Sequence, residues 1–192
     1  GLYGETFFEP LTAMAFGAGF TSRLRFGMDV MVVPYRPAVL TAKVLASIDA
    51  LSGGRVILGA GVGILRGEFE ALGIPYAARG AITDEYLRAF AELWSSEQPR
   101  FAGQHVRFAD LRFAPRPVQQ PSIPIWIGGN SRLAQQRAAE LGDGWHPYAS
   151  RLEEFAEGVA AVRKLRSQAG RSAEFTFSYS CPEMHLTDRA WS

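Results

Sequence analysis

Cysteine is almost absent from this sequence of 192 residues. The single cysteine, Cys181, cannot form an internal disulfide, which favours a reducing compartment. No apolar stretch approaches the roughly 18–20 residues that a membrane span needs. The opening residues contain the acidic Glu5 and Glu9 and no basic segment, unlike a secretory signal. We therefore expect a cytoplasmic protein.

An excess of charge of one sign is also missing. Twenty Lys and Arg residues against 19 Asp and Glu give a formal net charge of +1, and the basic residues are scattered along the chain. We therefore expect neither nucleic acid nor a membrane surface as a partner. The three histidines lack paired carboxylate spacing, so no metal site is predicted.

What the sequence does contain is a regular alternation of buried-type strands and amphipathic helices. Leu24–Val33 has the pattern of a strand closed by Pro34, and a helix is predicted from Pro37 to Gly53. Further strands are predicted at Arg55–Val62, Pro124–Ile127, Trp145–Pro147 and Phe175–Ser180, with helical stripes at Ile82–Leu93, Ser131–Leu141 and Phe155–Leu165. This alternation predicts right-handed βαβ units and a parallel sheet.

One polar stretch interrupts the alternation. Residues 99–121 include Pro99, Pro115 and Pro117 and are predicted to form a hairpin-like insertion outside the sheet. No linker or repeat divides the chain, so residues 1–192 are expected to form a single domain. Five strands are too few for a closed (β/α)8 barrel, which needs eight strands and about 250 residues. The pattern alone therefore leaves an open doubly wound sheet and a partial barrel as alternatives.

Glycines gather where two of the predicted strands end. Gly59, Gly61 and Gly63 end one strand, and Gly128-Gly129-Asn130-Ser131 ends another and opens a helix. Ligands of parallel α/β folds bind at the carboxyl ends of strands, and a helix amino terminus suits a phosphate. The alternative is that the paired glycines only form a tight turn, with Ser131 as a plain helix cap.

One histidine is expected at a strand end. The run Asp143-Gly144-Trp145-His146 brings an imidazole there, where general acid catalysis is possible. A partly exposed loop histidine is the alternative interpretation. His146 is the only local candidate for a catalytic residue.

Several segments, taken in order, resemble the luciferase-like monooxygenase family and, more narrowly, its coenzyme F420-dependent oxidoreductases. The matching runs are Leu51–Arg55, Gly61–Gly63, Glu68–Gly73, Pro115–Gln119, Ile125–Ser131 and Gly142–Trp145. The resemblance implies an α/β fold, the (β/α)8 TIM barrel of the bacterial luciferase-like type, with an insertion that fits residues 99–121. It also implies that the chain lacks the first two barrel strands and the last.

The resemblance implies where a flavin ring would bind. The ring would lie against a bulge after the third barrel strand, which often contains a non-proline cis peptide and maps to Asp29 and Val30. Gly61 and Val62 would line the ring or its ribityl chain. Met28 and Asp29 stand where the family often has small or hydroxyl residues, and an ionised Asp29 would repel an anionic reduced deazaflavin unless it is compensated.

The cofactor phosphate would map to Gly128, Gly129, Asn130 and Ser131, in agreement with the argument from the helix terminus. The family's usual proton donors lie near the second barrel strand, outside this chain. The function implied is an oxidoreductase that moves a hydride between coenzyme F420 and a small organic substrate. A homodimer is the expected assembly.

Three alternatives to this function stay open. The nearest is an FMN-dependent luciferase-like monooxygenase, in which reduced flavin activates oxygen. A further one is a non-catalytic barrel or partner subunit that has lost its flavin. Another phosphate-binding barrel, such as an isomerase, would need a pair of general bases at strand ends, and the sequence shows none.

Overall fold

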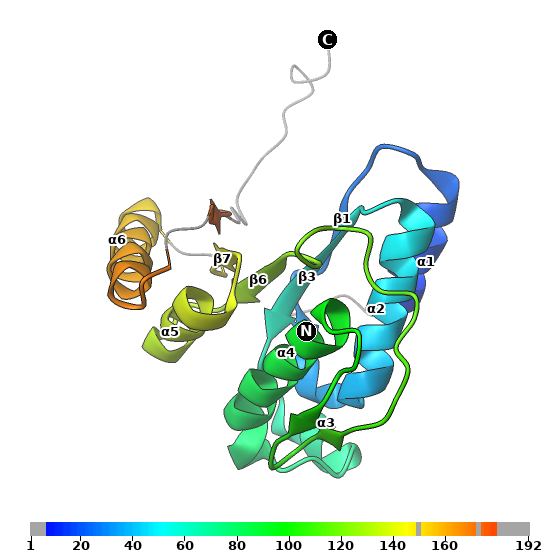
Figure 1. Cartoon of the computed structure of the whole chain (residues 1–192). Coiled ribbons are helices and arrows are strands. Elements are labelled where there is room, and N and C mark those ends of the chain that lie inside the picture. Colours follow the sequence, from blue (N-terminus) through cyan, green and yellow to red (C-terminus); the bar gives the residue numbers. More distant parts are fainter. Residues whose placement is uncertain (1–6, 149–150, 172–173, 180–192) are drawn as a thin grey trace. The chain divides into compact units, whose positions relative to one another are not determined.

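The computed structural model describes residues 7–148, 151–171 and 174–179. The chain divides into two compact units, residues 1–126 and 127–192, and the division falls within one short strand (Figure 1). No helix of the described residues is long and apolar enough to cross a membrane.

The first unit alternates helices with short parallel strands. Its elements in chain order are α1 (Pro10–Phe20), β1 (Phe26–Gly27), β2 (Met31–Val32), η1 (Val33–Tyr35), α2 (Ala38–Ser52), β3 (Val56–Gly61), α3 (Arg66–Ala71), η2 (Tyr76–Ala78), α4 (Arg79–Ser95), β4 (Phe101–Ala102) and β5 (Arg107–Phe108). Both β1 and β2 pair with β3 in parallel, as the sequence pattern predicted. Helix α2 packs against both α1 and α4 (Figure 1).

Local sequence explains the limits of the central elements of this unit. Helix α2 begins after Pro37 and ends at Gly53, whose φ of +72° is the left-handed conformation that glycine tolerates best. All six residues of β3 are buried, the pattern expected for a strand covered on both faces. Asp49 of α2 is fully buried, and its carboxylate accepts hydrogen bonds from the backbone N–H groups of Val118 and Gln119.

The predicted hairpin-like insertion is present. Strands β4 and β5 pair antiparallel to each other and form a two-stranded sheet separate from the parallel strands. The peptide bonds Ala114–Pro115 and Gln120–Pro121, which follow the hairpin, are cis. Strands β4 and β5 therefore lie outside the parallel sheet, and the bounds of the insertion, residues 99–121, stay a prediction.

The second unit continues the strand–helix alternation. Its elements are the end of β6 (Ile125–Gly128), α5 (Arg132–Leu141), β7 (Gly144–His146), α6 (Leu152–Gln168) and β8 (Thr176–Phe177). The strand order is β6-β7-β8, and β7 pairs with β8 in parallel. Helices α5 and α6 lie side by side (Figure 1). The division into two units does not decide whether the chain is a single domain. That expectation stays a prediction.

Candidate functional site

A bulge separates β1 from β2 in the first unit. Gly27 pairs with Ile57 and Met31 pairs with Ala60, so four residue steps in the first segment match three in β3. The extra residue lies within residues 28–30 and leaves the ladder locally unpaired. The sequence pattern predicted one continuous strand here, and this prediction of continuity is wrong.

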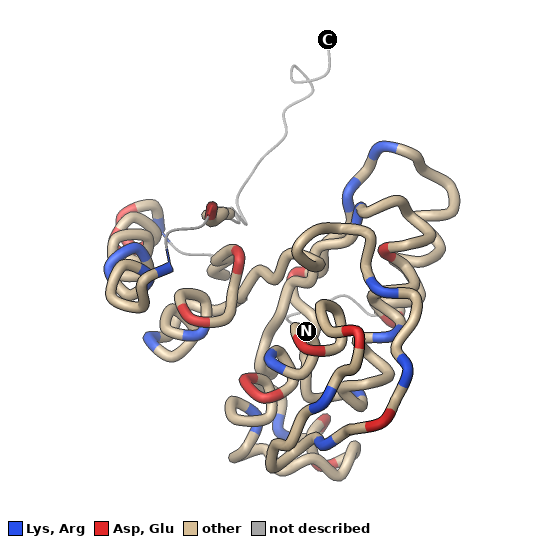
Figure 2. The backbone as a smooth tube through the Cα atoms, viewed as in Figure 1, with Lys and Arg blue, Asp and Glu red and all other residues tan. Residues whose placement is uncertain are grey.

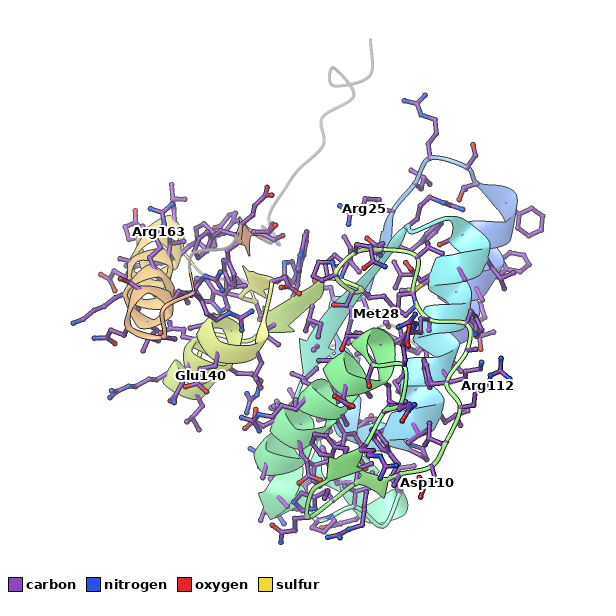
Figure 3. The ribbon with its side chains drawn as sticks, viewed as in Figure 1. Arg25, Met28, Asp110, Arg112, Glu140 and Arg163 are labelled. Carbon is purple, nitrogen blue, oxygen red and sulfur yellow. The ribbon has the colours of Figure 1, made fainter. Side chains whose placement is uncertain are left out.

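The bulge lies at the position that the resemblance implied. The peptide bond between Asp29 and Val30 is cis, which confirms that part of the expectation. The Asp29 side chain is exposed and Val30 is half-buried. Figure 3 labels Met28, which opens the bulge. Whether these residues contact a flavin ring is not tested by their positions, so that role stays a prediction.

The glycines of β3 make room for the bulge. A Cβ on Gly59 would lie 1.6 Å from the Met28 carbonyl oxygen, and one on Gly61 would lie 2.4 Å from Val30 Cγ2. Packing against the bulge is therefore a sufficient reason for glycine at both positions. The proposed contact of Gly61 and Val62 with a cofactor stays a prediction.

A group of aromatic and charged side chains follows the carboxyl ends of β2 and β3. The Tyr35 hydroxyl donates a hydrogen bond to the Glu68 carboxylate. Burial, and next this hydrogen bond, raise the pKa of Tyr35, so its phenol stays protonated. The Phe69 ring packs between Tyr35 and Tyr76. Tyr35 could not be identified from the sequence, because its partner Glu68 lies on another element.

In the second unit, the turn between β6 and α5 has the features of an anion site. Gly129 has a φ of +104°, which a branched residue would adopt only with strain. The Ser131 hydroxyl caps α5 by accepting from the Ala134 N–H group at 3.2 Å. The first turn of α5 contains no acidic residue and opens with Arg132. Since the first N–H groups of a helix have no partner within it, this turn presents donors and a positive partial charge.

The side chain of Asn130 holds the ends of β6 and β7 together. Its Nδ2 donates to the Tyr148 carbonyl oxygen at 2.7 Å, and its Oδ1 accepts from the Tyr148 N–H group at 2.8 Å. The Trp145 Nε1 atom also donates to the Gly129 carbonyl oxygen at 3.0 Å. The Asn130 side chain is thus committed to the protein, and only its backbone is left to contact a phosphate.

His146 ends β7 and is half-buried. Its Nδ1 atom lies 3.0 Å from the Ser178 hydroxyl oxygen, within hydrogen-bonding distance. The β7–β8 register explains this contact, because Trp145 pairs with Phe177 and the next residues then face each other. Ser178 and Tyr148 could not be identified from the sequence, since neither lies in a recognisable motif. His146 stays a candidate proton carrier at the same strand end as the β6–α5 turn.

No group of three or more His, Cys, Asp or Glu side chains in the described part of the chain is placed to hold a metal ion. The second unit offers anion binding at the amino terminus of α5, with the His146 imidazole as a group able to exchange protons at the same strand end.

The model of the family described as luciferase-like monooxygenase matches residues 1–185. The chain belongs to the luciferase-like monooxygenase family. Among its curated relatives is the FMNH2-dependent dimethylsulfone monooxygenase of Pseudomonas putida, which is 31% identical over 157 residues. That match covers 80% of this chain and 43% of the relative.

Two solved structures share the fold of this luciferase-like chain. Monooxygenase RslO1 from Streptomyces bottropensis is 27% identical with a TM-score of 0.79. The coenzyme F420-dependent tetrahydromethanopterin reductase from Methanopyrus kandleri is 21% identical, also with a TM-score of 0.79. Each match covers 90% of this chain and 54% of the other.

These likenesses confirm the luciferase-like (β/α)8 TIM barrel, here represented in part, over the open doubly wound sheet. The chain spans between 39% and 59% of the length of the curated relatives compared with it. Among these enzymes, the Pseudomonas putida relative is named for FMNH2 and the Methanopyrus kandleri reductase for F420.

Proposed function

We propose that this protein is an oxidoreductase that binds a phosphate-bearing flavin or deazaflavin and acts on a small organic substrate. Membership of the luciferase-like family supports the class of enzyme. The single observation that carries the proposal is the β6–α5 turn, where a capped helix terminus without acidic residues follows a glycine of positive φ. This donor set fits a phosphate.

In this proposal the protein binds and orients the cofactor and the substrate. The cofactor, when bound, supplies the redox chemistry that side chains lack. A phosphate at the α5 terminus gains about 0.3–1 kcal/mol from the helix, or up to about 2 kcal/mol when partly buried. Each hydrogen bond to its charged oxygens contributes about 1.5–3 kcal/mol more. Ser131 can donate its hydroxyl proton to the anion while its oxygen accepts from Ala134. His146, held by Ser178, is the candidate for moving a proton.

Two cofactors are candidates. The ordered motifs of the sequence favour coenzyme F420, with hydride transfer to or from a small organic substrate. FMN-dependent monooxygenation is the second candidate, and a specific observation favours it: the Pseudomonas putida relative is named for FMNH2. Fluorescence titration of the protein with F420, FMN and FAD separates these candidates, and binding of none of them would favour the non-catalytic alternative.

The phosphate assignment is tested by Ser131→Asp, with Ser131→Asn as the matched neutral control. Aspartate and asparagine cap helices as well as serine, so both variants should keep the fold. Only aspartate places a carboxylate where the phosphate would bind. We expect Ser131→Asp to weaken binding of the phosphate-bearing cofactor at least tenfold, and Ser131→Asn to change it less than threefold.

For FMN, riboflavin, which lacks the phosphate, provides the internal control in the same titrations. Its affinity should be the same in both variants, because only the phosphate meets residue 131. Circular dichroism reports whether the fold is retained. If well-folded Ser131→Asp binds the cofactor as tightly as the parent protein, the phosphate site is not at this turn.

A further inference from the structure

A cavity of about 520 Å³ lies in the second unit where α6 ends and β8 begins. It is separate from the proposed phosphate site. Strand β8 runs parallel to β7, and the segment after β7 is hydrogen-bonded to Asn130 after β6. The carboxyl ends of these strands therefore share one edge, whereas the cavity lies at the amino end of β8, on the opposite edge.

Guanidinium groups and aromatic rings line this cavity together. The Arg166 guanidinium carbon lies 4.2 Å from the centroid of the Phe175 ring, and that of Arg163 lies 5.3 Å from the centroid of the Phe177 ring. Figure 3 labels Arg163 on α6. Arg166 is only 6% exposed, so a charged group is held in a largely desolvated wall. Stacking on a ring orients a guanidinium plane. Arg166 also donates to the Gly142 carbonyl oxygen at 3.5 Å, whereas Arg163 is exposed on the cavity wall.

The cavity carries an excess of positive charge. Among the residues that the structure describes, its lining includes Arg163, Arg166 and Arg171 and no carboxylate. Burial, and next the charge of Arg171, lower the pKa of Arg166, and the attraction of Asp143 opposes them more weakly. Arg171 donates to the backbone carbonyl of Glu140, an acceptor without formal charge.

We propose that this cavity binds a small organic anion: an aromatic carboxylate, sulfonate or phosphate. The arginine forks match the oxygens of such a group, and the rings of Phe175 and Phe177 contact its apolar part. The volume lies within the roughly 300–1,000 Å³ of typical ligand pockets. An anion here also relieves the repulsion between Arg166 and Arg171. This site does not depend on the cofactor assignment, since it uses none of the residues of the β6–α5 turn.

Phenyl phosphate is a suitable probe, titrated into the protein by isothermal calorimetry. We expect phenyl phosphate to bind at one site in this cavity. Inorganic phosphate and phenol should each bind at least tenfold more weakly, because inorganic phosphate lacks the ring and phenol lacks the phosphate. Arg163→Gln should weaken phenyl phosphate binding about tenfold. Lys164→Gln is the matched control: the neighbouring residue on α6 is also exposed and loses the same charge, but it does not line the cavity.

Ser131→Asp separates the two candidate anion sites. Phenyl phosphate affinity should be unchanged in this variant, because the cavity lies at the other strand edge. Three results would overturn the proposal: no binding to the parent protein, equal losses in Arg163→Gln and Lys164→Gln, or loss of binding in Ser131→Asp. Inorganic phosphate that binds as tightly as phenyl phosphate would also overturn it, since the arginines would then form an unspecific basic patch.

Discussion

At Gly59 the absence of a side chain is a requirement of packing. An added Cβ would lie 1.6 Å from the carbonyl oxygen of Met28, which belongs to the backbone of the bulge and cannot rotate away. The corresponding contact at Gly61 is with a Val30 methyl group, which a change of rotamer can move. Glycine is therefore required more strictly at Gly59 than at Gly61, and the bulge depends on it.

Gly59→Ala should lower the free energy of unfolding by about 3 kcal/mol, the upper range of typical overpacking. The physical reason is that either β3 or the bulge must shift. Gly67→Ala in α3 is the matched control, because nothing lies within 4 Å of its added Cβ; it should stabilise the helix by roughly 0.5–1 kcal/mol. Urea denaturation measures both changes. A Gly59→Ala variant as stable as the parent protein would contradict this account of the bulge.

At the scale of elements, the Glu85 carboxylate holds the turn of the β4–β5 hairpin to α4. Glu85 accepts hydrogen bonds from the backbone N–H groups of Gln104, His105 and Val106, at 2.9, 2.6 and 2.6 Å. Burial acts to raise the pKa of Glu85, but these three hydrogen bonds outweigh it, so the net shift is downward. The ionised form is the one that holds the hairpin.

The stabilisation from Glu85 should therefore depend on pH. Its folded pKa lies below the unfolded value of about 4.3. The contribution is thus fully present above that value and is lost as the pH falls through the folded pKa. The difference in unfolding free energy between the parent protein and Glu85→Gln should shrink from pH 6 to pH 3 in urea denaturation. Glu70→Gln, an exposed control on α3, should show no such trend; a constant difference for Glu85→Gln would refute the assignment.

Elements whose signals are local could be predicted from the sequence. Strand β3 was expected at Arg55–Val62 and spans Val56–Gly61, because a run of buried residues is visible without knowing what covers it. Helix α2 follows Pro37 and stops at Gly53 as expected. Helix α1 was not predicted, because it is apolar on most sides and so shows no clear helical stripe.

The sequence predicted only those features of the candidate site that depend on residues close together in the chain. The helix cap at Ser131 could be predicted from the glycine pair before a helix, and this cap is present in the structure. The pairing of Asn130 with Tyr148 and that of His146 with Ser178 join residues 18 and 32 positions apart. Such contacts depend on strand register, which no single segment encodes. The strand pattern did not show the break between β1 and β2 for the same reason, since the bulge packs on a distant strand; the bulge was implied by the family resemblance alone.

At the scale of the whole molecule, α1 presents an aromatic surface to solvent. Phe16 and Phe20 are 68% and 76% exposed, with ring centroids 4.7 Å apart. No Lys, Arg, Asp or Glu lies on α1 (Figure 2). Exposed apolar patches of this kind mark interaction surfaces. The expected homodimer would bury this one.

The double variant Phe16→Ser with Phe20→Ser should weaken self-association at least tenfold, because it removes the apolar surface without touching the core. Leu133→Ser is the control, since Leu133 is 70% exposed on α5; it should leave association unchanged. Sedimentation equilibrium over a range of concentrations gives the dimer dissociation constant. A parent protein that stays monomeric throughout would contradict the homodimer.

The pairing of Asn130 with Tyr148 gives the molecule an internal reporter. The Tyr148 amide proton lies beyond the end of β7, yet it is bonded to a side chain of the β6–α5 turn. Its exchange with solvent deuterium requires Asn130 to release it, so the exchange rate measures how often the turn opens. The exchange rate of this one amide therefore reports how ordered the proposed phosphate turn is in cofactor-free protein. Slower exchange after addition of FMN or F420 would show that the ligand orders the turn further.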